Sequence, residues 1–275
     1  MVASTEIDTI ERETLAMLDA TLGVIADRQA EVAPEMRRTQ KALQRIRAIA
    51  ARPAVIALAG EFNSGKSSLT NRLVELDALP TDLFANTTVP TRLHWARELT
   101  LTAVTASGQR IPLDLTELRL EEPLTRIDVG APGQLLKTYE LVDMPGLADP
   151  DAERTGNELT ALRPNALIWC TPTTQAWKET ERAVWVRLPK RLKQSTILAL
   201  TFADLVEDRQ EIARVRARLQ HEAGPFLKII AVSAIPTHRA GRIALRAACS
   251  DLAIELKLDR QLKAAKLGER LLAEL

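Results

Sequence analysis

Short apolar runs recur along the middle of the chain and alternate with segments of helical period. Each run is continuous rather than alternating, which is typical of strands buried on both faces of a parallel sheet. Helical patterns at 179–192 and 206–221 separate the later runs. The pattern therefore predicts an α/β fold, with a mostly parallel sheet covered by helices on both faces. The runs lie at 54–59, 140–143, 166–170, 196–201 and 228–232.

Three segments depart from this alternation. Residues 92–128 contain short strand-like stretches around a Ser107-Gly108 turn, which predicts an antiparallel hairpin at the sheet edge. Residues 4–50 carry apolar side chains at helical spacing, and Pro34 is expected to end or kink that pattern, giving two helices. Residues 239–275 also have a helical pattern.

The two terminal segments predict a separate helical part. Each has an apolar stripe that must be buried, so we expect them to pack together as a short neck-like bundle. The alternative is that they cover exposed faces of the sheet. We expect an N-terminal helical segment at 1–50, a nucleotide-binding domain at 51–238 and a C-terminal helical segment at 239–275.

Composition narrows the class of protein. Aromatic residues make up 3% of the 275 residues and hydrophobic residues 46%, so the core must consist mainly of Leu, Ile, Val and Ala. A formal net charge of +1 gives no general attraction to nucleic acid, and we predict no nucleic-acid partner. The first residues lack the basic and apolar regions of a signal peptide, and no run approaches the roughly 18 apolar residues of a membrane span. We expect a cytoplasmic protein, with peripheral contact at the inner membrane left open.

One segment has the spacing of a phosphate-binding loop. Gly60-Glu-Phe-Asn-Ser-Gly-Lys-Ser-Ser68 matches G-x-x-x-x-G-K-[ST] and lies between a predicted strand and a predicted helix at 66–75. In such a loop, successive backbone N–H groups and a helix N-terminus attract phosphate oxygens. We expect Lys66 to reach the β- and γ-phosphates and the Ser67 hydroxyl to bind Mg²⁺. The alternative is a chance match. The expected phosphate-binding residues are Gly60, Asn63, Ser64, Gly65, Lys66, Ser67 and Ser68.

A second candidate segment, Asp143-Met-Pro-Gly146, follows the apolar run at 138–142. A carboxylate at a strand end can hold Mg²⁺, usually through water, and the N–H of Gly146 can meet the γ-phosphate. Alone, the motif could be a simple turn. Between the two segments, residues 86–91 form a Thr-rich stretch. A threonine there could close on Mg²⁺ and orient the attacking water, or the stretch could be a loop entering an edge strand.

Two further strand ends suggest base recognition. Thr201-Phe-Ala-Asp204 ends the fourth apolar run, and the Asp204 carboxylate can accept hydrogen bonds from guanine N1–H and N2–H₂. Ser233-Ala234 follows the last run, where backbone N–H groups can meet guanine O6. Both motifs are common short sequences, so the hypothesis rests on their order along the chain and on their position at strand ends.

With these motifs the chain resembles the dynamin superfamily, in particular its bacterial dynamin-like branch, over about residues 50–240. The resemblance implies hydrolysis of GTP to GDP and phosphate with Mg²⁺. It places Asn63, Lys66 and Thr87 at the catalytic centre, and Ser67, Thr87 and Asp143 around the metal. Thr88 is the alternative to Thr87. The similar segments are GEFNSGKSSLTN from Gly60, Leu79-Pro-Thr81 with the Thr-rich stretch after it, Asp143 to Leu147, and Trp169 through Thr174-Gln-Ala-Trp177.

The chain also departs from that family pattern. Phe62 and Asn63 stand where the eukaryotic branch has Gln and Ser, and Asn63 could substitute near the β–γ bridge. Phe202 replaces the Lys of T/N-K-x-D and could stack on the base instead. We expect the chain to lack the long stalk of membrane-remodelling members.

The resemblance implies two kinds of partner. The first is a second copy of the chain, in a homodimer through the nucleotide face that stimulates slow basal hydrolysis. The second is a larger dynamin-like protein, on which the chain would dock as a nucleotide-dependent binding module with weak hydrolysis. Membrane remodelling by this chain alone is the least favoured hypothesis.

Overall fold

The computed structural model describes residues 2–27, 34–75, 89–113, 123–147, 159, 162–224 and 226–273. The chain divides into two compact units. The sheet unit is Ala54–Leu252, and the helical unit is Met1–Pro53 with Ala253–Leu275. The last helix contributes to both units. The three segments expected from the sequence, with boundaries after residues 50 and 238, stay a prediction.

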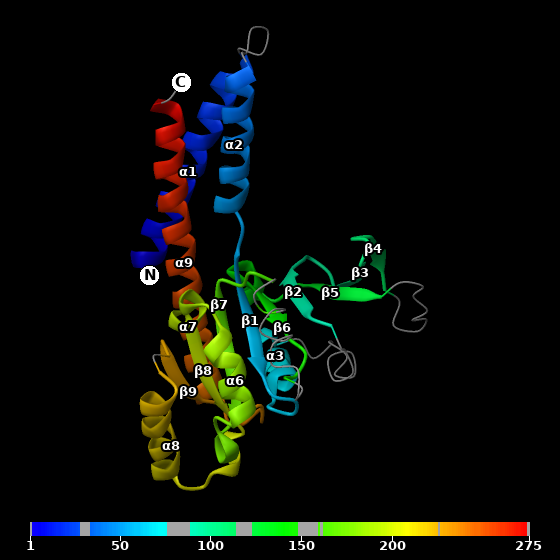
Figure 1. The fold of residues 1–275 in the computed structure, drawn as a ribbon, viewed down its shortest axis with the longest axis vertical. Coiled ribbons are helices and arrows are strands. Elements are labelled where there is room, and N and C mark those ends of the chain that lie inside the picture. Colours follow the sequence, from blue (N-terminus) through cyan, green and yellow to red (C-terminus); the bar gives the residue numbers. More distant parts are fainter. Residues whose placement is uncertain are drawn as a thin grey trace. The chain divides into compact units, whose positions relative to one another are not determined.

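The described strands of the sheet unit form one nine-stranded sheet (Figure 1). Its order is β4-β3-β5-β2-β6-β1-β7-β8-β9. The neighbours from β6 to β9 in this order all pair in parallel. The strands are β1 (Ala54–Gly60), β2 (Thr91–Trp95), β3 (Thr100–Thr105), β4 (Arg110–Pro112), β5 (Leu124–Ala131), β6 (Tyr139–Asp143), β7 (Ala166–Pro172), β8 (Thr196–Thr201) and β9 (Lys228–Ala231).

The central strands are almost entirely buried, as their continuous apolar runs predict. Every residue of β6 and β8 is buried, and so is all of β1 except Val55. In the register of β1, Leu58 lies beside Asp143 of β6 and beside Ile168 of β7. Because parallel strands end at the same edge, this register brings the segments that follow β1, β6, β7 and β8 together. The predicted α/β fold class is confirmed.

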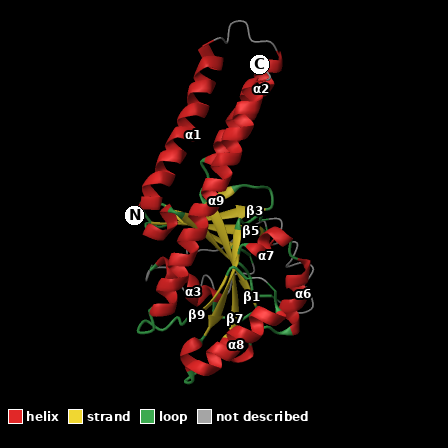
Figure 2. Ribbon diagram, turned by 90° about the vertical axis from the view of Figure 1, so that its left-hand side faces the viewer, coloured by secondary structure: helices red, strands yellow, loops and turns green. Residues whose placement is uncertain are grey.

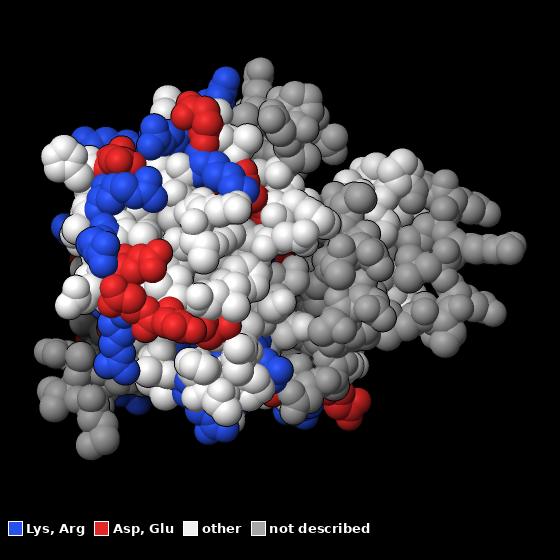
Figure 3. Space-filling model, turned by 90° about the horizontal axis from the view of Figure 1, so that it is seen from below, with Lys and Arg blue, Asp and Glu red and all other residues white. Residues whose placement is uncertain are grey.

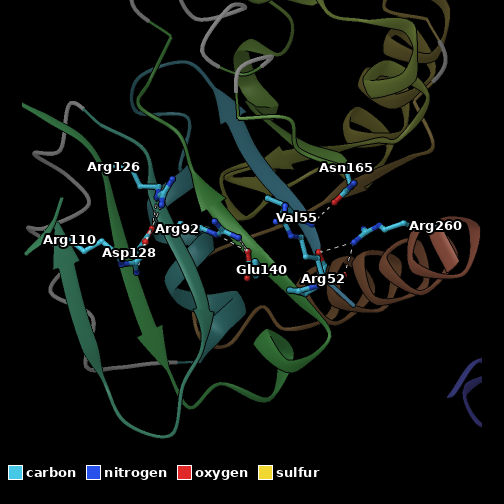
Figure 4. Close-up of polar contacts among 10 residues, drawn as sticks. Arg52, Val55, Arg92, Arg110, Arg126, Asp128, Glu140, Asn165 and Arg260 are labelled. Carbon is cyan, nitrogen blue, oxygen red and sulfur yellow. Dashed lines mark hydrogen bonds and ion pairs between the residues drawn. The ribbon is translucent and has the colours of Figure 1, made fainter. Parts of the chain in front are cut away.

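The far side of the sheet is mixed: β2 pairs antiparallel with β6 but parallel with β5, and β3 pairs antiparallel with β5. Strand β3 pairs antiparallel with β4 around the Ser107-Gly108 turn, which confirms the predicted edge hairpin. Asp128 of β5 is 3% exposed and lies between two arginines (Figure 4). Arg126 Nε is 2.6 Å from its Oδ1 and Arg110 Nη2 is 2.9 Å from its Oδ2. These ion pairs offset the desolvation cost of the buried carboxylate.

Helices cover both faces of the sheet (Figure 2). Helix α3 (Lys66–Val74) and the first part of α9 (Ala240–Ala273) lie on one face. Helices α6 (Glu179–Arg187) and α7 (Lys190–Gln194) lie on the other, and α8 (Arg209–Glu222) precedes β9. Short 3₁₀ helices are η2 (Gln134–Lys137), η3 (Thr173–Gln175) and η4 (Ala203–Leu205).

Two helix predictions need correction. The single helix expected at 179–192 is wrong, because α6 ends at Arg187 and Leu188 adopts an extended conformation before Pro189. A residue before proline is sterically restricted from the helical region, so the chain must restart as α7. Helix α8 begins at Arg209 rather than 206, because Asp208 caps it and accepts a hydrogen bond from Gln210 N at 2.8 Å.

A tryptophan cluster fills the core between the sheet and α6. Trp169, Trp177 and Trp185 have ring centroids 5.5–5.9 Å apart, and Phe226 joins Trp185 at 4.8 Å. All three indoles are buried. They are therefore packing residues, and their tilted and edge-on geometry adds to the stabilisation from apolar burial.

The helical unit contains α1 (Val2–Asp27), α2 (Pro34–Ala50) and the later part of α9. Pro34 starts α2, a position where its missing N–H costs nothing. Leu18, Leu43 and Ala264 come from the three helices and share one hydrophobic core. The terminal segments thus pack together as a bundle. Arg260 Nη1 donates to the carbonyl oxygen of Arg52 at 2.6 Å, just beyond the end of α2 (Figure 4). None of the described helices has the length and apolar character to cross a bilayer.

We predict that Leu43→Ala destabilises the helical unit by about 2–5 kcal/mol, because it removes a fully buried side chain and leaves a cavity. Ile49→Ala, on the same helix but at a side chain 51% exposed, should change the free energy of unfolding by about 0.5 kcal/mol or less. Urea unfolding of the intact chain, followed by circular dichroism, measures both. Equal losses in the two variants would contradict the bundle core.

Candidate nucleotide-binding site

The loop between β1 and α3 has the backbone shape of an anion cradle. Asn63 (φ 60°) and Gly65 (φ 82°) both adopt left-handed conformations. Such residues among right-handed neighbours turn successive N–H groups toward one concave surface. Lys66 begins α3, so the positive end of that helix faces the same surface. The loop Gly60–Ser68 can therefore bind phosphate through its backbone.

Lys66 lies in this cradle with its side chain 6% exposed. Its Nζ donates to the carbonyl oxygens of Gly60 at 3.0 Å and Glu61 at 2.6 Å. Burial lowers the pKa of Lys66, while the charge of Asp143 acts to raise it. An ammonium has three N–H donors, so Lys66 can keep both carbonyls and still donate to a phosphate oxygen.

Asp143 is the buried carboxylate of the site. It ends β6 next to β1, is 5% exposed, and interacts with the Ser67 side chain. Burial raises the pKa of Asp143 to about 6, against the opposing effects of Ser67 and Lys66. Within the described part of the chain, its Oδ1 has no hydrogen-bond partner. A hydroxyl and a carboxylate with an unused oxygen suit Mg²⁺, so the residues fit this ion.

The segment after Asp143 is packed directly onto the phosphate loop. Met144 N donates to Leu58 O at 3.1 Å and Leu147 N donates to Gly60 O at 3.0 Å, which extends the pairing beyond the strand ends. A Cβ on Gly146 would lie 2.7 Å from the Cα of Phe62. Only glycine allows this approach of two backbones. Gly146 therefore lies against the phosphate loop.

Glu61 connects the phosphate loop to the start of α6. Its Oε2 lies 2.7 Å from Lys178 Nζ, and its Oε1 accepts a hydrogen bond from Thr180. Burial acts to raise the pKa of Glu61, but the hydrogen bonds from Lys178 and Thr180 outweigh it and lower that pKa. Sequence reasoning missed this connection. No local pattern could reveal it, because 119 positions separate Thr180 from Glu61.

A second buried carboxylate continues this connection into the core. Glu181 is fully buried and accepts hydrogen bonds from Trp169 Nε1 at 2.8 Å, Thr171 Oγ1 at 3.0 Å and the backbone N of Lys178 at 2.9 Å. Burial raises the pKa of Glu181 although these hydrogen bonds oppose the rise. The ion pair at Glu61 is thus anchored to the tryptophan cluster through Lys178.

The predicted base-recognition residues lie at the same edge of the sheet. Thr201 Oγ1 donates to Ser64 O of the phosphate loop at 2.7 Å. Phe202 adopts a left-handed conformation (φ 53°), and its ring lies 3.2 Å from where a Cβ of Gly65 would be. Phe202 therefore packs on the phosphate loop. Asp204 follows in η4 and is half-buried.

The two predicted base-recognition segments, 201–204 and 233–234, are held together by a backbone hydrogen bond between the ends of their strands. Ala203 N donates to Val232 O at 3.1 Å, which places the end of β8 beside the end of β9. Ser233, 4% exposed, comes next, and its Oγ accepts a hydrogen bond from Ile235 N at 3.0 Å. Thr201–Asp204 and Ser233-Ala234 thus lie next to each other, as a base pocket requires.

Some predicted residues cannot be placed. Thr87, its alternative Thr88 and the Leu79-Pro-Thr81 motif lie outside the described residues. The described end of that stretch is Thr91, which is buried and pairs with Asp143 across β2 and β6. Its Oγ1 has no hydrogen-bond partner among the residues described. We did not single out Thr91 from the sequence, and its place at the end of the Thr-rich stretch was the available signal.

Charge does not dominate the face at which β1 ends. Figure 3 views the molecule from this side, and its described part shows Lys, Arg, Asp and Glu side chains around a largely uncharged middle. This distribution agrees with the formal net charge of +1. Anion binding at this face must therefore come from the local cradle rather than from a broad basic surface.

Comparison with known proteins decides the family. The family model described as "Dynamin family" matches residues 56–203, which include the phosphate loop, Asp143, Gly146 and Thr201. The chain belongs to the dynamin family. The resemblance inferred from the sequence is confirmed.

Relatives of this dynamin-family chain are bacterial. It is 31% identical over 191 residues to Dynamin-like protein 2 of Campylobacter jejuni subsp. jejuni serotype O:23/36 (strain 81-176), covering 65% of this chain and 30% of that protein. It is 38% identical over 125 residues to Isoniazid-induced protein IniC of Mycobacterium tuberculosis (strain ATCC 25618 / H37Rv), covering 41% of this chain and 25% of that protein. The chain thus spans less than a third of the length of these relatives.

A solved structure supports the same fold. It is described as an oligomerised bacterial dynamin pair that provides a mechanism for the long-range sensing and tethering of membranes. The TM-score is 0.63 at 22% identity, over 81% of this chain and 38% of that one. At this identity the likeness concerns the fold alone.

We predict that Gly146→Ala lowers the free energy of unfolding by about 1–3 kcal/mol, because the new methyl group would overlap the backbone of Phe62. The control is Gly23→Ala in α1, where an added Cβ meets nothing within 4 Å. This control should gain about 0.5–1 kcal/mol from improved helix propensity. Thermal denaturation compares the two variants, and an unchanged stability of Gly146→Ala would refute the close backbone contact.

Proposed function

We propose that this dynamin-family chain binds GTP and hydrolyses it to GDP and phosphate with Mg²⁺, slowly as a monomer. The observation that carries the proposal is the arrangement at the end of β1. Lys66 lies buried in the phosphate loop, and the buried carboxylate of Asp143 interacts with both Lys66 and Ser67. This is the donor set that a magnesium-bound nucleoside triphosphate needs.

Each residue has a distinct role in this proposal. Backbone N–H groups of Asn63 to Ser68 bind the phosphates, and Lys66 donates to the β- and γ-phosphates. Ser67, Asp143 and Thr87 hold Mg²⁺, which when bound neutralises charge on the β- and γ-phosphate oxygens. Gly146 donates its N–H to the γ-phosphate, Thr87 orients the attacking water, and Asn63 acts near the β–γ bridge.

Guanine selection follows from the other strand ends. The Asp204 carboxylate accepts hydrogen bonds from both N1–H and N2–H₂ of guanine, a donor pair that adenine lacks. The backbone at Ser233-Ala234 meets O6. Phe202 supports the base as an aromatic surface in place of a lysine stem, since its ring already packs on Gly65.

We predict that Lys66→Ala weakens GTP binding by about 10- to 100-fold, because it removes charge-assisted hydrogen bonds to phosphate. Lys190→Ala, at an exposed lysine of α7, should bind as the parent chain does. Isothermal titration with GTP, GDP and ATP in the presence of Mg²⁺ measures both. Binding of none of the three by the parent chain would refute the nucleotide site, and equal affinity for ATP and GTP would refute guanine selection.

Three exposed apolar side chains at the nucleotide edge support dimerisation. Phe62, Leu205 and Ile235 follow β1, β8 and β9, and their side chains are 70%, 65% and 43% exposed. Exposed apolar side chains around a binding site are typical of a surface that another protein covers. We propose that a second copy covers this face when nucleotide is bound and thereby stimulates hydrolysis.

In phosphate-release assays, we expect the rate per chain to rise with protein concentration. Phe62→Ser should reduce this rise several-fold, because the interface loses an apolar contact. Val186→Ser, at a side chain 72% exposed on α6, should keep the rise. A near-zero rate at every concentration would rule out an active GTPase.

A nucleotide-dependent binding module is the second candidate. Phe62 and Phe202, which replace polar residues of the family pattern, favour tight docking over fast turnover. The chain would then dock on a larger dynamin-like protein or on membrane machinery, with peripheral contact at the inner membrane. Co-purification of such a partner with GTP but not GDP supports this function, and the same result in both states counts against it. Co-sedimentation with liposomes, with and without GTP, tests direct membrane contact.

A further inference from the structure

Arg242 makes an unusual set of contacts beside the proposed base pocket. It lies in the first turn of α9 and is 8% exposed. Its Nη1 donates to the carbonyl oxygens of Ser233 at 2.7 Å and Ile235 at 2.6 Å, and its Nη2 donates to that of Pro236 at 3.1 Å. One guanidinium thus holds most of the loop 233–236, which we call the base loop.

The base loop is also held from a second side. Arg72 of α3 donates from Nε to the carbonyl oxygen of Ala234 at 3.2 Å. The N–H of Ile235 is taken by Ser233 Oγ at 3.0 Å. Each of the four carbonyls of the base loop therefore accepts a hydrogen bond from an arginine, and the peptide planes have little freedom to rotate.

These contacts fix the direction of one N–H group. In a trans peptide the carbonyl and the following N–H point in opposite directions. Because the Ser233 carbonyl points at Arg242, the N–H of Ala234 points away from it. No hydrogen bond to this N–H occurs among the described residues. The base loop thus presents one oriented donor at the end of β9.

The position of Arg242 is electrostatically unfavourable, which suggests a purpose beyond stabilising the helix. A cation in the first turn of α9 opposes the helix dipole. Burial, together with the nearby charges of Arg72 and Arg239, lowers the pKa of Arg242. The guanidinium is planar and carries its donors on separate nitrogens, so it can reach three carbonyls spread along the loop, which the single nitrogen of a lysine would not match.

The start of α9 is itself fixed next to the base loop. A Cβ on Gly241 would lie 2.1 Å from the carbonyl oxygen of Ala231, so the helix touches the last residue of β9. Arg242 is therefore carried by backbone that cannot move without moving the strand end. A positioning side chain on such a support holds its partners accurately.

We propose that Arg242 is a positioning residue for guanine specificity, holding the base loop so that the N–H of Ala234 donates to O6 of the base. The inference rests on the proposed binding of GTP. The hydrogen bonds of Arg242 described above all go to the base loop and none goes to the phosphate loop. Its effect must therefore appear in the choice of base rather than in phosphate binding.

The test compares Arg242→Lys with the parent chain by titration with GTP, 6-thio-GTP and tripolyphosphate, all with Mg²⁺. Sulfur at position 6 accepts hydrogen bonds poorly, so 6-thio-GTP isolates the O6 contact. Arg242→Lys should weaken GTP binding by about tenfold, the equivalent of one hydrogen bond. The affinity for tripolyphosphate should not change, and the affinity for 6-thio-GTP should change little. The ratio of the affinities for GTP and 6-thio-GTP should therefore fall to near one.

Arg239→Lys is the matched control, since Arg239 is exposed and gives the base loop one hydrogen bond, from Nε to Pro236 O at 3.3 Å. It should keep the parent preference. Arg242→Gln, which has donors for fewer carbonyls and no charge, should also lose the preference. Circular dichroism checks the fold of each variant.

The inference is overturned if Arg242→Lys weakens all three ligands equally, if the preference for GTP survives, or if both Arg242 variants unfold. The first and last outcomes would make Arg242 a purely structural residue. A parent chain that binds GTP no better than ATP would instead refute the proposed guanine specificity itself. The two failures are therefore distinguishable.

Discussion

An ammonium and a carboxylate are buried together where an apolar sheet ends. Lys66 and Asp143 are 6% and 5% exposed, and each would be strongly destabilising there without a partner. Two backbone carbonyls hold the lysine, while Ser67 and Lys66 favour the charged form of the carboxylate. The phosphate loop, the register of β1 with β6 and the start of α3 must all keep their places for these charges to be tolerated.

The loop that carries these charges is held on three sides. Strand β6 continues its pairing into the loop through Leu147, β8 reaches it through Thr201, and α6 reaches it through the ion pair at Glu61. The first two contacts use the backbone or a short side chain, and the third joins two long side chains, so the cradle is held from three directions. A cradle arranged in advance lowers the entropic cost of binding an anion.

Much of this fold follows from local sequence patterns. Continuous apolar runs predict the buried strands, and the G-x-x-x-x-G-K-[ST] spacing predicts a loop between a strand and a helix. The edge hairpin follows from the Ser107-Gly108 turn between two short strand-like stretches. Pro189 divides a segment that looked like one helix, because its steric effect on Leu188 outweighs the helical pattern.

The contacts between distant segments could not be predicted in this way. The pairing of β2 antiparallel with β6 but parallel with β5 depends on how the chain crosses the sheet. The ion pair of Glu61 with Lys178 and the hydrogen bond from Arg72 to Ala234 join residues far apart in the chain. Hydrophobic periodicity records which face of an element is buried and carries no information on such partners.

The tryptophan cluster has an optical consequence. Trp169 donates its indole N–H to Glu181, Glu181 accepts from the backbone of Lys178, and Lys178 pairs with Glu61 of the phosphate loop. Three chromophores in mutual contact are thus joined to the loop through two carboxylates and one lysine. Indole emission responds to nearby charge. The intrinsic fluorescence of the tryptophan cluster is therefore expected to change when the charge or the contacts of the phosphate loop change.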